Sequence, residues 1–500
     1  MHFDRRWAHC FWKPQTILAA SLLLAVSFAA PSWAQENSAP AQALPEPSEV
    51  EALKERLRAL ERTVEDLKKE RGAAPDEVGK LPPTGEQQRP TAGTSTTVPE
   101  HNRERGFLRQ DSYADPRLDN APFDPKLRGF FLIPGTQSMF RIGGFARTDV
   151  IHDFQPAGNT SKFVPPSIPT GPNPGNDNSN LSVAASRLSI EMRNNTRYGP
   201  LRIYYENDFN NGPNSTPNFR LRHFYGQWLN VLVGQTFSTW KDVDAVPDTV
   251  DFHGPTGLIS RFQPQIRYTH AINPNNILAA AVEQPTTEVP ATVTTPTGAV
   301  NVTATNPLPD FVARYRYQQN HFHIQNAWLF RSLGGFAGAT AEEQVFGWGG
   351  MVSGGAQVYG KDNIVFQASV GEGTARYIQD LGSGSGLDVG LTAEGRVVAL
   401  PAYGGHVAYQ HFWTDRWRST ATYGFFQVNT TDLAQTSTNP TTLYAKTQYA
   451  EGNLIYSPGA GFKVGAALLW GQHQTKDGAN ADAFRLNVVL QYDLIDLGNW

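Results

Sequence analysis

Cysteine and long hydrophobic runs are scarce in this sequence of 500 residues. The single cysteine, Cys10, excludes disulfide bonds within the chain and leaves no cysteine chemistry elsewhere. After Ala34 no apolar stretch reaches the roughly 20 residues that a membrane-spanning helix needs, which excludes a helical membrane protein. Basic residues are not in excess, because the net charge is -4. With no basic stripe either, we expect no nucleic-acid partner.

The first 34 residues predict a secretory signal peptide. Arg5, Arg6 and Lys13 precede an apolar run over 17–30, and small residues before Gln35 provide a cleavage position. A retained membrane helix is the rival interpretation, but the apolar run is shorter than a bilayer requires. We therefore expect export, with cleavage before Gln35.

Residues 48–70 follow a flexible lead over 35–47 and have apolar side chains spaced alternately three and four apart. This spacing predicts a coiled coil, with a seam formed by Val50, Leu53, Leu57, Leu60, Val64 and Leu67. β-branched a positions with leucine at d favour a dimer, whereas 56–61 resembles the pattern of short trimeric coiled coils. A lone amphipathic helix on another surface is the alternative. The next segment, 71–105, is rich in proline, threonine, glycine and charge, which predicts a disordered linker.

From Phe140 onward, apolar and charged residues alternate with a period of two. Phe140, Ile142 and Val150 share one face of the first such stretch, and Arg141 and Arg147 share the other. This pattern is typical of a strand between two different environments. It recurs down the chain, and the basic residues of the charged faces are Arg141, Arg147, Arg187, Arg193, Arg202, Arg220, Arg222, Arg267, Arg314 and Arg316. They outnumber the acidic residues of those faces, which are Asp149, Asp153, Glu191, Glu206, Asp208 and Asp310.

The connections between strands alternate between short turns and long loops, as in an outer-membrane barrel. Long loops are expected at 154–180, 209–218, 239–261, 285–309, 332–344, 373–402, 429–443 and 473–482. We count about 17 candidate strands, and assigning the weakest, 386–398, to a loop leaves about 16, an even number. A soluble sandwich has less reason to segregate its loop lengths, and no propeller repeat is present. The sequence thus predicts an all-β transmembrane antiparallel barrel over 139–500, after a lead-in or plug segment over 106–138.

Two stretches carry a resemblance to a known family. They are GFFLIPGTQSMFRIGGFARTDVIHDF at 129–154 and VGQTFSTWKDVDAVPDTVDFHGPTGLISRFQPQIRYTH at 233–270. Both are similar to signature stretches of the DcaP-like outer-membrane porins, and the likeness in arrangement runs from the heptads to the end. The resemblance implies a homotrimeric barrel in the bacterial outer membrane, in contact with its lipids, with the coiled coil in the periplasm. It also implies passive uptake of small, often anionic solutes. The sequence ends on Trp500 where Phe is usual, and we expect this aromatic to serve the barrel assembly machinery.

The charged strand faces of such a barrel line a water-filled lumen. Rings of arginine favour anions, and a guanidinium holds a carboxylate by two hydrogen bonds. We therefore expect a preference for small organic anions such as dicarboxylates. The alternative is that neighbouring acids neutralise these arginines, or that the arginines only keep the wall solvated.

An acidic interlude, STWKDVDAVPDTVDFHGPTG at 238–257, interrupts the strand pattern with Asp242, Asp244, Asp248 and Asp251. It is the third long loop, after the fifth strand, where trimeric porins fold a loop inward to narrow the channel. We expect wall arginines to face these four aspartates across a pore constriction and to create a transverse field. The competing account is an exposed loop that binds divalent cations, although the carboxylates lack the spacing of a calcium loop.

Enzymatic function has little support in the sequence. His321 and His323 share a strand face, but no third ligand lies at a diagnostic spacing, and we expect solvated histidines there. No nucleophile elbow, zinc-protease motif or phosphate-binding loop is present. We therefore expect no catalytic residues, no metal and no cofactor. Two other functions stay open: an envelope tether or adhesin that uses the coiled coil or long loops, and a hydrolase built on the barrel.

Overall fold

A computed structural model describes residues 58, 62, 129–172, 175, 177–210, 217–290, 292–295, 298–337, 343–381, 386–391, 396–430, 443–459 and 461–494. The signal peptide, the coiled-coil seam, the linker over 71–105 and Trp500 lie outside these residues. Within 48–70 the structure describes Arg58 and Arg62, which are both helical and exposed. Nowhere in the described ranges is there a helix with the length and apolar character to cross a membrane.

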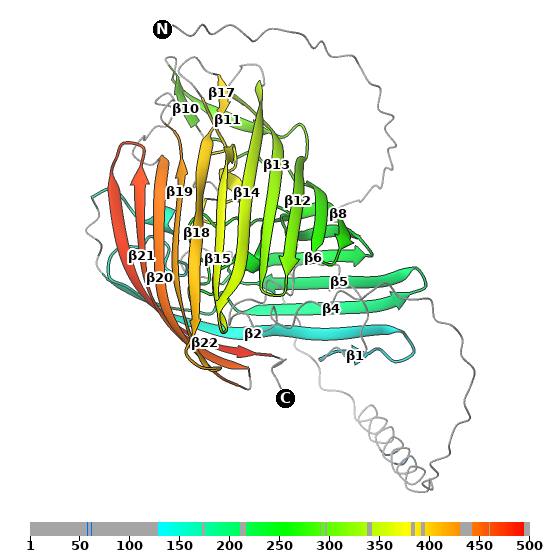
Figure 1. Cartoon of the computed structure of the whole chain (residues 1–500). Coiled ribbons are helices and arrows are strands. Elements are labelled where there is room, and N and C mark those ends of the chain that lie inside the picture. The colour runs from blue at the N-terminus through cyan, green and yellow to red at the C-terminus, as the bar shows by residue number, and fades with distance from the viewer. Residues whose placement is uncertain are drawn as a thin grey trace, which may run out of the picture. The chain divides into compact units, whose positions relative to one another are not determined.

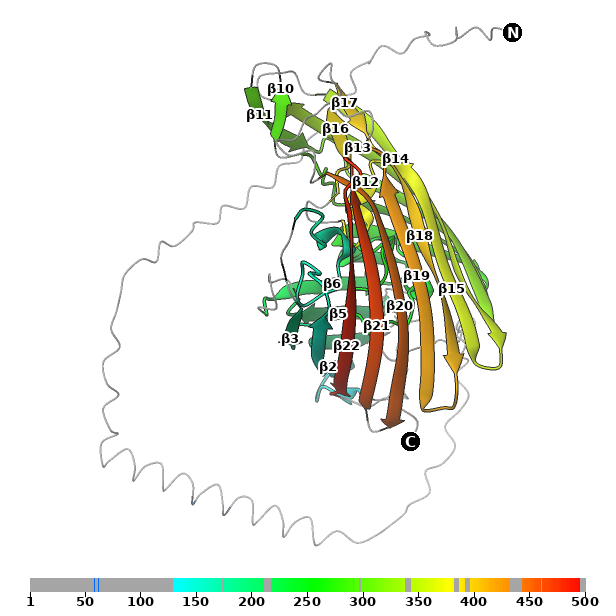
Figure 2. The same cartoon turned by 90° about the vertical axis from the view of Figure 1, so that its left-hand side faces the viewer.

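The chain forms a closed all-β barrel of 16 antiparallel strands (Figures 1 and 2). The barrel strands are β2 (Ser138–Asp153), β4 (Arg187–Thr196), β5 (Gly199–Asp208), β6 (Arg220–Trp228), β7 (Val231–Phe237), β8 (Phe262–Asn273), β9 (Asn276–Glu283), β12 (Asp310–Gln319), β13 (Phe322–Ala337), β14 (Glu343–Tyr359), β15 (Asp362–Glu372), β18 (Pro401–Phe412), β19 (Trp417–Val428), β20 (Tyr444–Gly459), β21 (Phe462–Thr475) and β22 (Asn480–Asp493). Each pairs with the next in this order. The predicted fold class is confirmed for the barrel.

The first barrel strand closes the sheet. The beginning of β2 pairs with β4, from Ser138 opposite Asn194. Its second half pairs with β22, from Phe145 opposite Asp493. Because every strand then has two neighbours, the barrel leaves no open sheet edge, which is the condition for strands to stand in lipid.

The barrel strands expose their apolar side chains on the outside and bury their polar side chains inside, the reverse of a water-soluble protein. On β2, the apolar Ile142 and Val150 are 44% and 40% exposed, whereas Arg141 and Arg147 are 7% and 2% exposed. The other barrel strands repeat this pattern, with polar side chains facing the lumen. The period-two alternation therefore predicted the correct faces, because an outward apolar band and a polar interior are what a transmembrane barrel requires.

The connections follow the predicted alternation with two exceptions. The segment over 386–398 belongs to a loop, as expected, because β16 (Val389–Leu391) and β17 (Val397–Ala399) pair only with each other. The long loops predicted at 332–344 and 473–482 are wrong. The pairing of β13 with β14 continues to Gly335 opposite Glu343, and that of β21 with β22 to Gln474 opposite Asn480. Cross-strand pairing thus continues into segments that the sequence pattern assigned to loops.

Four further strands lie outside the barrel order. β1 (Phe131–Leu132) and β3 (Asn178–Ser182) each pair with β2. β10 (Thr292–Thr295) and β11 (Gly298–Thr305) form a hairpin, and β11 pairs with the end of β13. The described part of the predicted lead-in segment thus contains a short strand that pairs with the first barrel strand.

Three long loops fill part of the lumen. We name them L1 (154–186, with the short helix η3 at Pro165–Ser167), L3 (238–261, with η4 at Val243–Ala245) and L6 (373–400, with η5 at Ala375–Tyr377). Their apolar side chains pack on the few apolar residues of the inner wall. One such core joins Trp240 of L3 and Tyr377 of L6 to Leu329 and Phe426 of the wall. The two largest hydrophobic clusters therefore lie where the loops meet the barrel.

Candidate functional site

Loop L3 crosses the lumen and touches opposite parts of the wall. The Trp240 indole Nε1 donates a hydrogen bond to the Ala327 carbonyl on β13 at 3.2 Å. The Val250 amide donates to the Glu451 carboxylate on β20 at 2.7 Å, and Arg147 Nη2 on β2 donates to the Val250 carbonyl at 2.6 Å. Contacts with β13, β20 and β2 place the loop inside the barrel, as its position in the strand order predicted.

A glycine at the end of the acidic stretch lets L3 lie directly on the wall. Gly257 has a φ of +81°, which L side chains rarely adopt. A Cβ added there would lie 2.7 Å from the Phe425 carbonyl oxygen and 2.9 Å from backbone atoms of Gly405. The loop backbone thus packs against the backbones of β18 and β19 with no room for a side chain.

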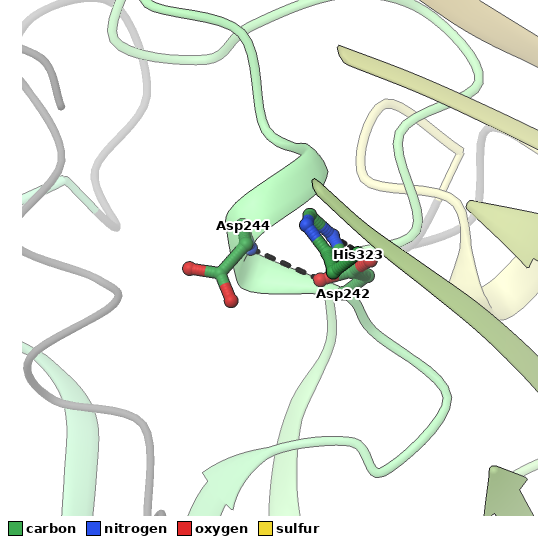
Figure 3. Close-up of side chains that lie close together, drawn as sticks. All are labelled: Asp242, Asp244 and His323. Atoms are coloured by element: carbon green, nitrogen blue, oxygen red, sulfur yellow. Dashed lines mark hydrogen bonds and ion pairs between the residues drawn. The ribbon is translucent and has the colours of Figure 1, made fainter. Parts of the chain in front are cut away.

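Asp242 binds L3 to the wall through its carboxylate. Its carboxylate accepts hydrogen bonds from His323 Nε2 at 2.9 Å, Ser353 Oγ at 2.7 Å and Arg316 Nη1 at 3.3 Å. It also caps η4 by accepting from the Asp244 amide at 3.1 Å (Figure 3). Burial alone would raise the pKa of Asp242, but His323 and Arg316 outweigh burial and hold that pKa below its ordinary value. The residue anchors L3 to β12, β13 and β14.

The same residues are the group that comes nearest to a metal site in the described chain. Ligand atoms of Asp242, Asp244 and His323 lie within 4.8 Å of one another. However, Arg316 already contacts the two carboxylates, at 3.3 Å and 2.7 Å, and the Asp244 carboxylate points away from the other two side chains (Figure 3). A guanidinium therefore supplies the positive charge, and the loop lies inside the barrel, whereas the divalent-cation account placed it outside.

Asp248 and Asp251 fix the later part of L3. Asp248 accepts hydrogen bonds from Arg418 Nε at 2.8 Å and from Gln410 Nε2 at 2.6 Å. Asp251 accepts from the Gly254 amide at 3.1 Å. Burial raises the pKa of Asp251 to about 6, against the opposing effect of Arg485. All four predicted aspartates are thus buried and bound.

A cavity of about 450 Å³ lies between L3, L1, L6 and the wall formed by β2, β4 and β6. Its basic lining residues are Arg147, Lys162, Arg187, Arg220, Arg222, Lys241 and Arg261, and its acidic ones are Asp251 and Asp380. Burial raises the pKa of Asp380 to about 6, with Thr256 opposing by its hydrogen bond. The cavity is therefore strongly basic, and most so below about pH 6.

Acids on the inner face of the wall offset part of this charge. Glu206 contacts Arg222 at 2.6 Å and Arg187 at 3.6 Å, and Asp208 contacts Arg220 at 2.5 Å. Arg147 pairs with Asp149 at 2.6 Å. Adding these three acids to the two in the cavity gives five negative charges against seven positive ones, so the basic side chains still outnumber these acids when all five are ionised.

The predicted arginines separate into three groups. Arg147, Arg187, Arg220 and Arg222 line the cavity. Arg141, Arg193 and Arg202 surround Glu191 instead. The remaining three lie elsewhere on the wall. Arg316 binds Asp242 and Asp244 of L3. Arg267 donates to the Phe237 carbonyl at 2.6 Å, and Arg314 is half-buried on β12.

The sequence reasoning missed the residues that the loops contribute. Lys162, Lys241, Arg261 and Asp380 belong to no alternating strand, so the strand period gives them no inward assignment. Phe252 of L3 was also missed, although it lies in the acidic stretch. Its ring lies 5.6 Å from the Arg147 guanidinium, 5.2 Å from that of Arg187 and 5.9 Å from that of Arg222.

Two histidine expectations have different outcomes. His321 is exposed beside the turn before β13 and bonds to Gln357. His323 is 6% exposed and bonds to Asp242, so the expectation of a solvated side chain is wrong for His323. The partner that buries it comes from L3, far away in the sequence, and no local pattern indicates it.

Loop L1 adds a titratable lysine, Lys162, to the cavity lining. Lys162 donates a hydrogen bond to the Asn210 carbonyl at 2.9 Å. Burial, together with the nearby Arg220, lowers the pKa of Lys162 to about 8. Burial likewise lowers the pKa of His253 to about 3, assisted by Lys162 and Arg220. Lys162 therefore carries most of its charge at neutral pH, and His253 carries none.

Comparison with solved structures finds one whose fold agrees with this architecture, and others that are less similar. The crystal structure of the outer membrane channel DcaP of Acinetobacter baumannii matches with a TM-score of 0.62 and 21% identity, over 73% of this chain and 99% of that one. The anion-selective porin from Comamonas acidovorans gives 0.49 and 10%, over 71% and 100%. Outer-membrane expressed OmpT of Vibrio cholerae gives 0.45 and 11%, over 73% and 100%. At 21% identity, the likeness to the DcaP channel concerns the fold.

Sequence comparison identifies the family. No curated protein matches the chain. The sequence profile of the DcaP outer membrane protein family matches residues 132–494, which is well over half of the 500 residues and nearly the whole barrel. The chain belongs to the DcaP outer membrane protein family.

Proposed function

We propose that this protein is a trimeric outer-membrane porin through which small organic anions, such as dicarboxylates, diffuse passively. The observation that carries this proposal is the basic cavity between L3 and the arginine wall. A solute that crosses the lumen beside L3 meets seven basic and two acidic side chains there. Guanidinium groups bind carboxylates in a bidentate manner, and rings of arginine favour anions over cations.

The four aspartates narrow the channel, in this proposal, by holding L3 across it. The charges of Asp242 and Asp244 are paired with Arg316, and that of Asp248 is paired with Arg418. A transverse field of the kind expected from the sequence then arises between the anchored carboxylates and the cavity arginines on the opposite side. An anion passes nearer to the cavity arginines, because Asp242, Asp244 and Asp248 are buried against Arg316 and Arg418 and do not line the cavity.

The reversal potential of the purified protein in a planar bilayer with a salt gradient tests the anion preference. We expect the sign of an anion-selective pore, and we expect swelling of proteoliposomes in dicarboxylates to exceed swelling in neutral sugars of the same size. A reversal potential of cation sign would overturn the preference. Absence of any conductance, from protein that is folded by circular dichroism, would overturn the porin itself.

Trimer formation and the coiled coil over 48–70 belong to the same proposal. Deleting 35–105 separates the channel from the extramembrane part, since all the described barrel strands begin after it. We expect the deletion to leave conductance intact. A tether or adhesin would instead lose its envelope phenotype while the barrel still conducts.

The anion preference is expected to fall in two steps as the pH rises. Around pH 6, Asp251 and Asp380 ionise and add negative charge to the cavity, because burial has raised their pKa values to about 6. Around pH 8, Lys162 loses its positive charge, because burial has lowered its pKa to about 8. Reversal potentials measured from pH 5 to 9 should show both steps.

The variant K162R separates the two steps, because arginine stays charged throughout this range. We expect K162R to keep the step near pH 6 and to lose the one near pH 8. A step near pH 8 that persists in K162R would assign it to another group and contradict the role of Lys162.

A further inference from the structure

The lining of the cavity beside L3 includes buried polar atoms that have no hydrogen-bond partner. Within the described part of the chain, four such atoms belong to lining residues: Arg147 Nη1, His253 Nε2, Arg261 Nε and Asp380 Oδ1. Arg147 and Asp380 are only 2% and 3% exposed. A buried polar atom without a partner costs free energy, so such atoms are few in folded proteins. Four of them around one cavity indicate a polar ligand.

Asp380 places an acceptor among these donors. Its Oδ2 accepts a hydrogen bond from Thr256 Oγ1 of L3 at 2.7 Å, which fixes the carboxyl group. No basic side chain of the described residues pairs with it. Burial raises the pKa of Asp380 to about 6, so the group is ionised at neutral pH. Its Oδ1 therefore requires a hydrogen-bond donor.

A plain dicarboxylate meets only part of these requirements. Its oxygens accept hydrogen bonds from the guanidinium groups of Arg147 and Arg261. An ionised dicarboxylate, however, has no donor for Asp380 and repels it. A hydroxyl group both donates and accepts, so it can donate to Asp380. It can also pair with His253 in either tautomer, because burial lowers the pKa of His253 to about 3 and leaves its ring neutral.

Uncharged polar side chains extend this hydrogen-bonding surface. The lining also contains Asn159, Gln235, Ser260 and Gln379, which are all half-buried. The aromatic rings of the lining already have a basic group over them, and they are Phe145, Phe237, Phe252 and Phe262. The cavity therefore favours a solute that forms many hydrogen bonds over one that stacks on rings.

We propose that the cavity beside L3 selects sugar acids, which carry hydroxyl groups together with carboxylates, over plain dicarboxylates of the same length. Carboxylates bind at Arg147 and Arg261, and hydroxyl groups donate to Asp380. The proposal rests on the proposed anion channel and narrows the class of solute that it takes. In this division of roles the basic groups attract the anion, and the acceptor from L6 distinguishes one anion from another.

Adipate and glucarate are matched probes for this selection. Both are dianions with a six-carbon chain, and glucarate adds four hydroxyl groups. Single-channel chloride current through the full chain is measured at pH 7 while either probe is added. We expect the half-blocking concentration of glucarate to be about fivefold lower than that of adipate, the effect of one net hydrogen bond. Equal values, or a lower value for adipate, would overturn the selection and leave the anion porin standing.

The variant D380N tests the acceptor itself. The new amide keeps an oxygen for Thr256 and places an NH2 donor where Oδ1 stood. D380N should therefore raise the half-blocking concentration of glucarate and lower that of adipate, so that their ratio falls to about one. A loosened loop would shift both concentrations in the same direction. A ratio that stays at the wild-type value in D380N would overturn the role of Asp380.

An exposed aspartate provides the matched control. Asp415 pairs with Lys361 at 3.0 Å and its side chain is 87% exposed, so D415N removes the same charge away from the cavity. Its ratio of half-blocking concentrations should equal that of wild type, and an equal fall in D415N would overturn the assignment to Asp380. A wild-type channel that neither probe blocks, with a reversal potential of cation sign, would overturn the anion porin and the selection together.

Discussion

Replacing Lys162 and Arg261 together by glutamine is expected to remove most of the anion preference of the channel. Both side chains line the basic cavity and are half-buried, so a passing ion meets them directly. Among the described residues, Arg261 has no ion pair and its Nε has no hydrogen-bond partner, and Lys162 bonds to a neutral carbonyl. Each of these two charges contributes about 1 kcal/mol at close range even in water, which predicts a fall of about tenfold or more in the anion-to-cation permeability ratio.

A surface lysine provides the matched control for this experiment. Lys361 lies in the turn between β14 and β15, is 52% exposed and pairs with Asp415 at 3.0 Å. K361Q removes one charge from the chain without altering the lumen, and its reversal potential should equal that of wild type. An equal shift in K361Q would mean that net charge sets the selectivity. An unchanged ratio in the double variant would remove the cavity from the selectivity filter.

The strands could be predicted from the sequence because a barrel wall imposes a period of two on every residue that crosses it. Arg141 and Arg147 face inward, and Ile142 faces outward, for this single reason. The same logic gave the inward position of L3, which follows from counting strands. Local preference failed where pairing continued beyond it, as at Gly335 on β13.

The partners of the L3 aspartates could not be predicted, because the closure of the barrel decides them. His323 on β13 and Ser353 on β14 bind Asp242, and Arg418 on β19 binds Asp248. All three partners are distant from L3 in the sequence. No local spacing relates residues that meet only across the lumen. The inward folding of L1 and L6 was not predicted either. The sequence indicates it only by a few apolar residues in otherwise polar loops.

Replacing Asp242 by asparagine is expected to release L3 from the wall. The Asp242 carboxylate is 1% exposed and accepts three side-chain hydrogen bonds, including one from the buried Arg316. Breaking a buried ion pair by removing one partner costs about 3–5 kcal/mol, because the other charge stays buried. D242N should therefore show a higher single-channel conductance and a lower unfolding temperature by circular dichroism.

The pH dependence of this anchor follows from the lowered pKa of Asp242. The stabilisation is present above the ordinary pKa of an aspartate and is lost as the pH falls through the lower pKa of the folded state. Acid should thus raise the conductance of wild type toward that of D242N, and it should change D242N less.

An exposed aspartate separates anchoring from surface charge. Asp415 pairs with Lys361, and its side chain is 87% exposed, so D415N should conduct and unfold like wild type. Ion preference then decides between two roles of Asp242. An anchor predicts larger solute flux in D242N with weaker discrimination among solutes of different size. A residue that acts only through its field predicts altered anion preference at unchanged conductance and stability, and that result would contradict the anchor.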